Sequence, residues 1–461
     1  MNAQTIGWFG VLRLGLVQTS LGAIVVLTTS TINRIMVVEL ALPALLPGLL
    51  VGLHYAIQIT RPRMGYGSDT GGKRTPWIIG GMLVLGLGGF LAALSTSLIS
   101  GSPVVGIALA VFAFLLVGLG VGAAGTSLLV LLAKSVAPRY RGAAASTVWV
   151  MMIIGFIVTA VVAGKQLDPF SFDRLLVVTG SVSLIAFIVT CIAVAGVEAK
   201  VLSAPKQQDA EAVAAHDEKS ARQAEIAEAG FSASIKAVWA EPDSRRFSVF
   251  VFISMLAYSA QDLILEPFAG SVFGMTPGES TQLSGAQHGG VLSGMLLVAL
   301  LTSVVGGRYL GSLRRWTIVG CIASAIALFS LAAGGFMSSS FPLRAVVFAL
   351  GLANGVFAVA AIGSMMDLVG RGGSQREGVR MGLWGAAQAI AFGLGGIGAT
   401  FAVDLSRVAL GDMSSAYAIV FVLQGLLFFW AARLAAGVYQ PAQAETVGQF
   451  SAGRIALEMD Q

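Results

Sequence analysis

The chain contains few charged residues: Asp, Glu, Lys and Arg together account for 11% of its 461 positions. Soluble globular domains average about 25%, so the composition excludes an ordinary soluble protein. Hydrophobic residues make up 56%, which predicts a multi-pass membrane protein surrounded by membrane lipid. The net charge of +5 does not predict binding to nucleic acid, because basic cytoplasmic loops give membrane proteins the same excess.

Cysteine and histidine are also rare, with two and three residues respectively. Cys191 and Cys321 both lie in apolar runs, so the sequence predicts neither a disulfide framework nor a metal cluster. It also lacks a nucleophile–base motif, a phosphate-binding glycine loop and a nucleotide site. We therefore expect a protein that is not an enzyme, has no metal site and requires no cofactor.

The sequence is rich in long apolar runs. They predict twelve transmembrane helices, six on each side of a polar insert. A helix needs about 20 apolar residues to span a bilayer. The runs lie at 12–33, 40–59, 77–97, 104–132, 143–164, 175–197, 247–268, 289–309, 316–337, 341–365, 382–403 and 416–438.

Most of the 28 Lys and Arg residues fall in the termini, the insert and the alternate loops on one side of these spans. Because Lys and Arg concentrate in cytoplasmic loops, we expect the N- and C-termini to be cytoplasmic. The predicted domains are an N-terminal six-helix bundle (1–197), a partly amphipathic cytoplasmic linker (198–246), a C-terminal six-helix bundle (247–440) and a cytoplasmic tail (441–461).

The two predicted bundles repeat one another in sequence. Residues Arg141–Trp149 correspond to Arg376–Trp384 with the same Arg-to-Trp spacing, and the fourth and tenth spans carry matching glycine pairs. Glycines one turn apart allow helices to pack closely. Two six-span repeats of parallel sense are typical of the major facilitator architecture, so the predicted fold class is an all-α membrane protein with the major facilitator fold.

The loop after the second span reads GYGSDTGGKR and resembles the loop signature of major facilitator proteins. Its aspartate can accept hydrogen bonds from a helix N-terminus or a basic group and so latch one conformation. The alternative is a basic loop with no gating role. Thr70 departs from the pattern, because many transporters have arginine there. The matching positions are Gly65, Asp69, Gly72, Lys73 and Arg74.

Two acids, Asp262 and Glu266, interrupt the apolar seventh span just before Pro267. Their spacing of four places them on one helix face. A charge facing lipid costs about 3 kcal/mol or more, so both are expected to face the protein interior. The repeat aligns this segment with the end of the first span, and we predict that Arg34 approaches Asp262 or Glu266 on the non-cytoplasmic side, since a paired charge is tolerated better than a single one.

This pairing has several interpretations that the sequence leaves open. It can be an extracytoplasmic gate, a proton-titrating site, a ligand contact or an ion pair at the helix ends. The candidate gate or ligand residues are Asn33, Arg34, Glu39, Gln261, Asp262 and Glu266.

His54 lies in the cytoplasmic half of the second span. An imidazole in an apolar helix can ligate the magnesium of a chlorin, which makes His54 a candidate pigment ligand. The interpretation we favour is a hydrogen bond to a neighbouring helix, because most buried polar side chains are satisfied in this way.

Three stretches, NRIMVVEL (Asn33–Leu40), AYSAQDLILEPFAG (Ala257–Gly270) and RPRMGYGSDTGGKRTPW (Arg61–Trp77), together with WAEPDSRRF before the seventh span, resemble the PucC/LhaA family. This family is the bacteriochlorophyll-delivery branch of the major facilitator superfamily. The resemblance covers essentially the whole chain, and the QD-x-x-L-EP pattern is its specific part. Phe268 and Ala269 depart from it, because Tyr and Gly are expected there.

The resemblance implies a light-harvesting complex assembly factor that binds bacteriochlorophyll or delivers it to antenna polypeptides. It also implies the photosynthetic, intracytoplasmic inner membrane of a bacterium, with bacteriochlorophyll, light-harvesting antenna polypeptides and chlorophyll synthase as expected partners. The alternatives are a proton-coupled secondary transporter of a small solute, which titrates Asp262 or Glu266, and a membrane scaffold. Without the resemblance, the residues alone favour the transporter.

Overall fold

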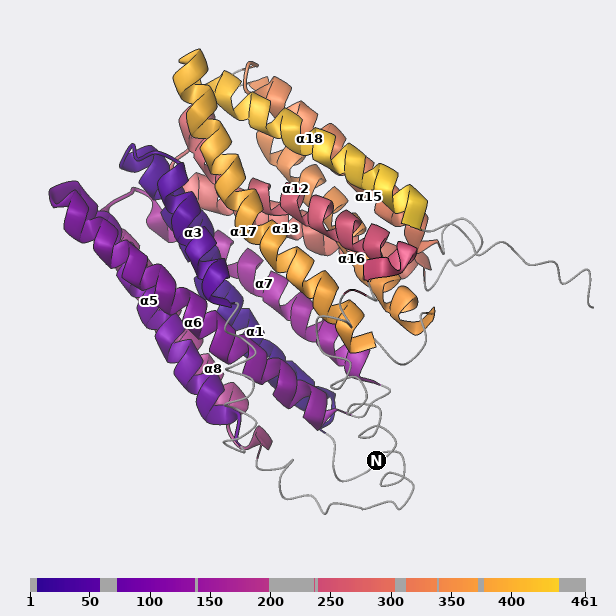
Figure 1. The fold of residues 1–461 in the computed structure, drawn as a ribbon. Coiled ribbons are helices and arrows are strands. Elements are labelled where there is room, and N and C mark those ends of the chain that lie inside the picture. The colour runs from indigo at the N-terminus through magenta and orange to yellow at the C-terminus, as the bar shows by residue number, and fades with distance from the viewer. Residues whose placement is uncertain are drawn as a thin grey trace, which may run out of the picture.

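The computed structural model of the protein is helical, and it describes most of the chain. The described ranges contain helices and no strands (Figure 1). These ranges are 6–58, 73–136, 140–198, 236, 239–302, 312–337, 340–371 and 377–438.

Within these ranges, 11 helices are long and apolar enough to cross a membrane, and α3 (Leu45–Ile57) is a shorter apolar helix. The first long helix runs from Trp8 to Glu39. It consists of α1 (Trp8–Val26), η1 (Leu27–Thr31), α2 (Ile32–Arg34) and η2 (Ile35–Glu39), of which η1 and η2 are π-helical. The other long helices are α5 (Thr75–Gly101), α6 (Pro103–Ser135), α7 (Arg141–Leu167), α8 (Phe172–Val194), α12 (Pro242–Phe273), α13 (Pro277–Leu300), α15 (Leu313–Gly334), α16 (Leu343–Arg371), α17 (Glu377–Leu410) and α18 (Met413–Val438).

The helices up to α8 form what we term the N-terminal half, and those from α12 onward form the C-terminal half. In the N-terminal half, α1 packs against α7 and α8, and α5 packs against α6 and α8. In the C-terminal half, α12 packs against α17 and α18, while α16 packs against α13 and α15. The halves meet where α7 contacts α13, α3 contacts α17, and the end of the first helix contacts α12 (Figure 1). The domain limits at 197, 246 and 440 and the cytoplasmic location of the termini stay predictions.

The internal repeat is visible in equivalent glycine contacts of the two halves. A methyl group added at Gly118 of α6 would lie 2.8 Å from the carbonyl oxygen of His54 on α3. A methyl group added at Gly351 of α16 would collide with the carbonyl of Gln287 on α13. In each half, therefore, glycine lets the fourth helix approach the backbone of the second, as expected for close packing between membrane helices.

Two of the differences between predicted and observed helix starts lie at the junction of the halves. The second span was expected to begin at residue 40, but residues 40–44 form a connection in which Ala41 has a φ of 49°. The eighth span was expected to begin at residue 289, but α13 begins at Pro277. The reason is a capping box, in which Thr276 accepts from the backbone of Glu279 while the Glu279 side chain accepts from that of Thr276.

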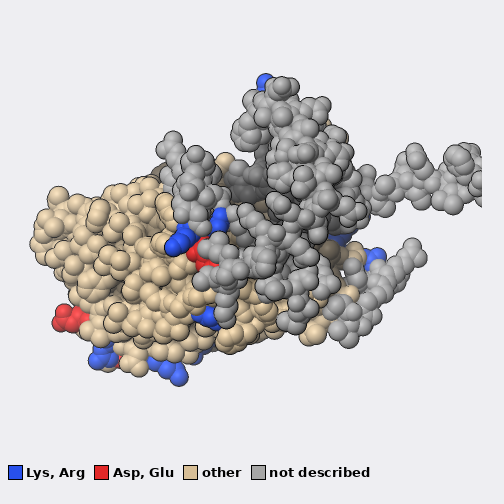
Figure 2. Space-filling view, turned by 90° about the horizontal axis from the view of Figure 1, so that it is seen from below, with Lys and Arg blue, Asp and Glu red and all other residues tan. Residues whose placement is uncertain are grey.

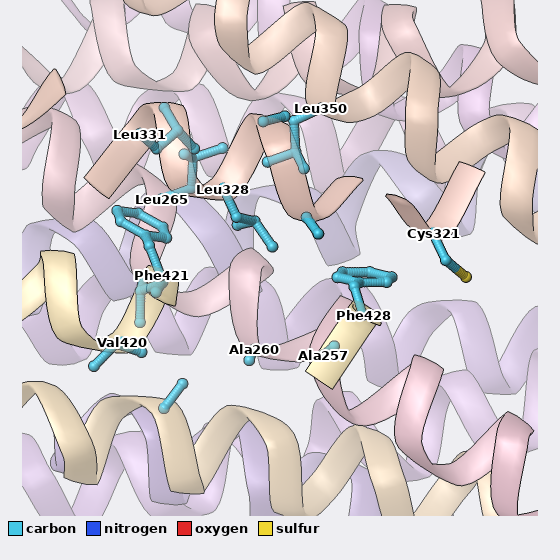
Figure 3. Close-up of a cluster of buried hydrophobic side chains, with 14 of the residues drawn as sticks. Ala257, Ala260, Leu265, Cys321, Leu328, Leu331, Leu350, Val420, Phe421 and Phe428 are labelled. Atoms are coloured by element: carbon cyan, nitrogen blue, oxygen red, sulfur yellow. The ribbon is translucent and has the colours of Figure 1, made fainter. Parts of the chain in front are cut away.

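The largest apolar core lies in the C-terminal half (Figure 3). Phe421 and Phe428 of α18 point toward side chains of α12 and α15, among them Leu328. The ring of Phe428 meets that of Phe357 at 5.8 Å in an edge-to-face arrangement, a favoured aromatic geometry. By contrast, the described residues on the face shown in Figure 2 are mainly uncharged, with Lys, Arg, Asp and Glu at scattered positions. This distribution is expected of a protein whose sides contact lipid.

Candidate functional site between the two halves

The end of the first helix is wound more widely than an α-helix. In η1 and η2, backbone hydrogen bonds join residues five apart, as between the N–H of Leu40 and the carbonyl of Ile35 at 3.0 Å. Such π-helical turns are rare and often occur at functional sites. They bring side chains five positions apart onto the same side of the helix.

Arg34 is 2% exposed and lies at the junction of the halves. Its Nη1 donates to the carboxylate of Glu39 in an ion pair, and its Nη2 donates to the carbonyl oxygen of Met275 at 2.6 Å. Gly270 makes room for this side chain, because a methyl group there would lie 2.9 Å from Nη2. The ion pair is therefore with Glu39, because the wide turn of η2 carries Glu39 within reach. Arg34 also approaches Glu266, as predicted, but forms no ion pair with it among the described contacts.

Glu266 is fully enclosed between the halves, at 1% exposed. Its Oε1 accepts a hydrogen bond of 2.6 Å from the hydroxyl of Ser30 on the first helix. Arg34 and Ser280 also lie near its carboxylate. The hydroxyls of the next residues along the two helices, Thr31 and Thr281, are 3.0 Å apart. Glu266 thus belongs to a polar layer that joins the two halves.

Asn33 and Gln261 do not face one another, although the repeat aligns them. The Nδ2 of Asn33 donates to the carbonyl oxygen of Leu263 at 2.7 Å, which ties the first helix to α12. The Oε1 of Gln261 accepts from Asn354 at 2.8 Å, and Asn354 accepts in turn from Ser324 at 2.8 Å. Gln261 therefore points into the C-terminal half, where it links α12 to α16 and α15.

Asp262 is half-buried, unlike Glu266 four residues later. Among the described residues it accepts no hydrogen bond, and it lies close to Tyr258, beside which Tyr55 of α3 also lies. The ring of Phe392 on α17 is 5.6 Å from that of Tyr55 and 6.0 Å from that of Tyr258. We term Tyr55, Tyr258 and Phe392 the aromatic cluster. Its three rings are half-buried and come from both halves, and the carboxylate of Asp262 lies close to one of them, that of Tyr258.

His54 is 2% exposed and stacks edge-on against Tyr55 at 4.9 Å. Its Nε2 lies 2.9 Å from Nε2 of Gln58, one turn along the same helix. Because an amide nitrogen only donates, the ring nitrogen accepts in this contact. The Nε2 of His54 is therefore already engaged by its own helix, and its assignment as a pigment ligand stays a prediction.

The superfamily loop is described only at its end, since Gly65, Asp69 and Gly72 lie outside the described residues. Lys73 is exposed, and Arg74 is buried just before α5. Glu198 caps that helix: its carboxylate accepts from the N–H of Arg74 at 2.6 Å and from that of Thr75 at 2.9 Å. Burial alone raises the pKa of Glu198, but these two donors outweigh it and hold the pKa below its usual value.

Three structural acids were missed by the sequence reasoning. Glu198 was taken as the first linker residue, while Asp168 and Asp404 were not singled out. Asp168 contacts the start of α13, and Asp404 contacts the start of α3. The partners are backbone N–H groups or a hydroxyl far away in the chain, so no local pattern marks them. The sequence feature that could have identified them is an acid at the end of a predicted span, where its carboxylate can reach the N-terminus of another helix.

Comparison with protein families and with proteins of known sequence gives a consistent result. A family model described as PUCC protein matches residues 31–443. The "Bacteriochlorophyll synthase 44.5 kDa chain" of Rhodobacter capsulatus is 50% identical over 450 residues, which cover 98% of this chain and 100% of that protein. A "Protein PucC" of Cereibacter sphaeroides is 30% identical over 442 residues, covering 90% of this chain and 89% of that protein.

Solved structures confirm the predicted major facilitator fold. The inward-open E. coli xylose transporter XylE has a TM-score of 0.68 at 13% identity, covering 96% of this chain and 98% of that one. A proton-dependent oligopeptide transporter has a TM-score of 0.66 at 15% identity, covering 93% and 98%. At these identities the similarity concerns the fold alone.

One expectation from the sequence is contradicted by these comparisons. The chain was expected not to be an enzyme, but the relative with 50% identity carries an enzyme name. The sequence argument rested on missing nucleophile, metal and nucleotide motifs. A chain that works within a larger enzyme assembly does not need such motifs itself, so their absence did not support the conclusion.

Proposed function

Because the chain belongs to the PUCC protein family, we propose that it handles bacteriochlorophyll during the assembly of light-harvesting complexes. In this proposal it binds the pigment in the photosynthetic inner membrane and passes it between pigment synthesis and antenna polypeptides. The observation that carries the proposal is the match over residues 31–443, supported by a relative of nearly equal length named for bacteriochlorophyll synthase.

The aromatic cluster supplies the chemistry that such a pigment requires. A chlorin offers a flat apolar ring, polar carbonyl groups at its edge and a central magnesium ion that accepts one further ligand. Tyr55, Tyr258 and Phe392 offer ring faces, and the two phenols can donate hydrogen bonds. Oxygen ligands suit magnesium, and the carboxylate of Asp262 accepts no other hydrogen bond among the described residues. The residues therefore fit the group, with Asp262 the better-placed ligand than His54.

The position of the cluster also suits transfer. It is built from α3 of one half and from α12 and α17 of the other. A relative movement of the halves changes the distance between its rings, which is how proteins of this architecture alternate access to a central site. Chlorophyll synthase and antenna polypeptides are the proposed donor and acceptor partners.

A second proposal is a proton-coupled transporter of a small solute. It is favoured by Glu266, an acid enclosed between the halves and bonded to Ser30 across them. Intramembrane acids of this kind commonly mark proton or ion pathways. Membrane vesicles then take up the solute only with a proton gradient, and Glu266→Gln abolishes the uptake.

The absorption spectrum of the gently purified protein tests the first proposal. We expect bacteriochlorophyll absorption in the wild type. Asp262→Leu should lower the pigment per protein about tenfold, which corresponds to a loss of about 1.4 kcal/mol of binding free energy. Asp412→Asn, which changes an exposed acid outside the cluster, is the matched control and keeps the pigment. A wild-type protein without pigment, isolated from cells that make bacteriochlorophyll, contradicts the proposal.

A further inference from the structure

Asp168 joins the halves at the end of the bundle where α13 begins. It follows α7 in the N-terminal half, and its carboxylate accepts from the hydroxyl of Thr276 at 2.7 Å and from the N–H of Gly278 at 3.2 Å. Thr276 is the N-cap residue of α13. A methyl group at Gly278 would collide with this carboxylate and with the carbonyl of Gly164 on α7. The acid thus sits directly on the N-terminus of a helix from the other half.

Asp404 makes the equivalent contact in the opposite direction. It lies on α17 of the C-terminal half, and its two carboxylate oxygens accept from the N–H groups of Ala44 at 2.9 Å and Leu45 at 2.7 Å. These groups open α3 of the N-terminal half. One turn earlier, Thr400 of α17 packs so closely on α3 that a methyl group at Gly48 would collide with its hydroxyl.

The two contacts are related by the internal repeat. In each, the fifth helix of one half supplies the acid, and the second helix of the other half supplies its N-terminus. A carboxylate is favoured at this position, because the unpaired N–H groups and the helix dipole attract negative charge. Arg34 of the first helix donates to the carbonyl of Met275, the residue before Thr276. Among the described residues, these polar contacts between the halves lie near the starts of α3 and α13.

We propose that Asp168 and Asp404 are a pair of latches that hold this end of the bundle closed, and that both must leave their helix N-termini for it to open. The end is closed in the structure, since Thr31 and Thr281 meet across the halves and are both 0% exposed. Opening removes two charged acceptors from four donor groups at once. The two acids therefore set the population of the open state, whatever ligand the protein binds.

A cysteine reporter between the halves tests the latches. The two native cysteines are replaced by serine, Thr281→Cys is introduced, and the protein is reconstituted in nanodiscs and reacted with a thiol reagent. Because the reporter is enclosed in the closed state, the rate of labelling measures opening. We expect labelling to be roughly tenfold faster for Asp168→Asn or Asp404→Asn, and roughly a hundredfold faster for both, as for the loss of one or two charged helix caps.

The matched control is Asp412→Asn. Asp412 also caps a helix, since it accepts from the N–H of Ser415 at 2.8 Å, but this helix, α18, lies in the same half. Its substitution should leave the labelling rate unchanged. Equal acceleration by Asp412→Asn, or no acceleration by either latch variant, overturns the proposal.

A second measurement, on the single variants alone, applies if the protein carrying both Asp168→Asn and Asp404→Asn cannot be reconstituted. In a protein carrying Thr31→Cys and Thr281→Cys, a disulfide forms readily in the closed state, because the two native hydroxyls are 3.0 Å apart. Each single latch variant should lower the yield of this cross-link. If the yield of the cross-link is unchanged in both single variants, the proposal that Asp168 and Asp404 act as latches is contradicted. Neither readout depends on pigment, so the outcome is independent of the proposed function.

Discussion

The polar face between the halves and the apolar core of the C-terminal half are both buried, yet different forces hold them together. The core consists of buried aromatic and aliphatic side chains from several helices, among them Phe421 and Phe428 of α18 (Figure 3). Between the halves, hydrogen bonds join polar groups, among them those from Ser30 to Glu266 and from Arg34 to the carbonyl of Met275. Tight packing resists rearrangement, whereas a few polar contacts can be exchanged. The comparison indicates rigid halves and a movable junction.

The largest effect is expected from a truncation in the core. Phe428 is 0% exposed, so Phe428→Ala leaves a cavity and should lower the free energy of unfolding by about 3 to 5 kcal/mol. Ser30→Ala removes only the donor to Glu266 and should cost about 1 to 3 kcal/mol. Thermal unfolding in detergent measures both. If Ser30→Ala lowers the free energy of unfolding more than Phe428→Ala does, the comparison is contradicted, because the junction is then held more tightly than the core.

A smaller effect, dependent on pH, is expected where Glu198 caps α5. The pKa of Glu198 is lower in the folded protein than its usual value of 4.5. A carboxyl of this kind stabilises the fold above its unfolded pKa and loses that contribution as the pH falls through the folded pKa. Glu198→Gln should therefore lower the melting temperature at pH 7, and the difference from the wild type should shrink below pH 4.5. A difference that is the same at pH 7 and pH 3.5 contradicts this assignment.

The fold could be predicted from the sequence because a membrane span requires a long apolar run, and such runs are easily recognised. The apolar runs do not predict the start of α13, because its first turns carry the polar residues Ser280, Thr281 and Ser284. These residues are buried against the other half and were taken for a loop. Hydropathy measures contact with lipid, so it cannot identify a helix whose polar face lies inside the protein.

The candidate site was predictable only in part. The positions of Arg34 and Glu266 at the junction follow from charge in an apolar helix. The pairing of Arg34 with Glu39 depends on the π-helical turn, which the hydropathy of the sequence does not indicate. Asp168 and Asp404 bind N–H groups or a hydroxyl at the starts of helices far away in sequence, and a backbone donor has no residue identity to recognise.

The most direct test of pigment handling at the junction compares two phenylalanines of the C-terminal half. Phe392 belongs to the aromatic cluster between the halves, while Phe428 belongs to the apolar core. Phe392→Leu and Phe428→Leu are purified from cells that make bacteriochlorophyll, and pigment per folded protein is measured by absorption. We predict that Phe392→Leu loses most of its pigment and that folded Phe428→Leu retains it. Equal retention in the two variants, or loss in Phe428→Leu alone, would contradict a pigment site between the halves.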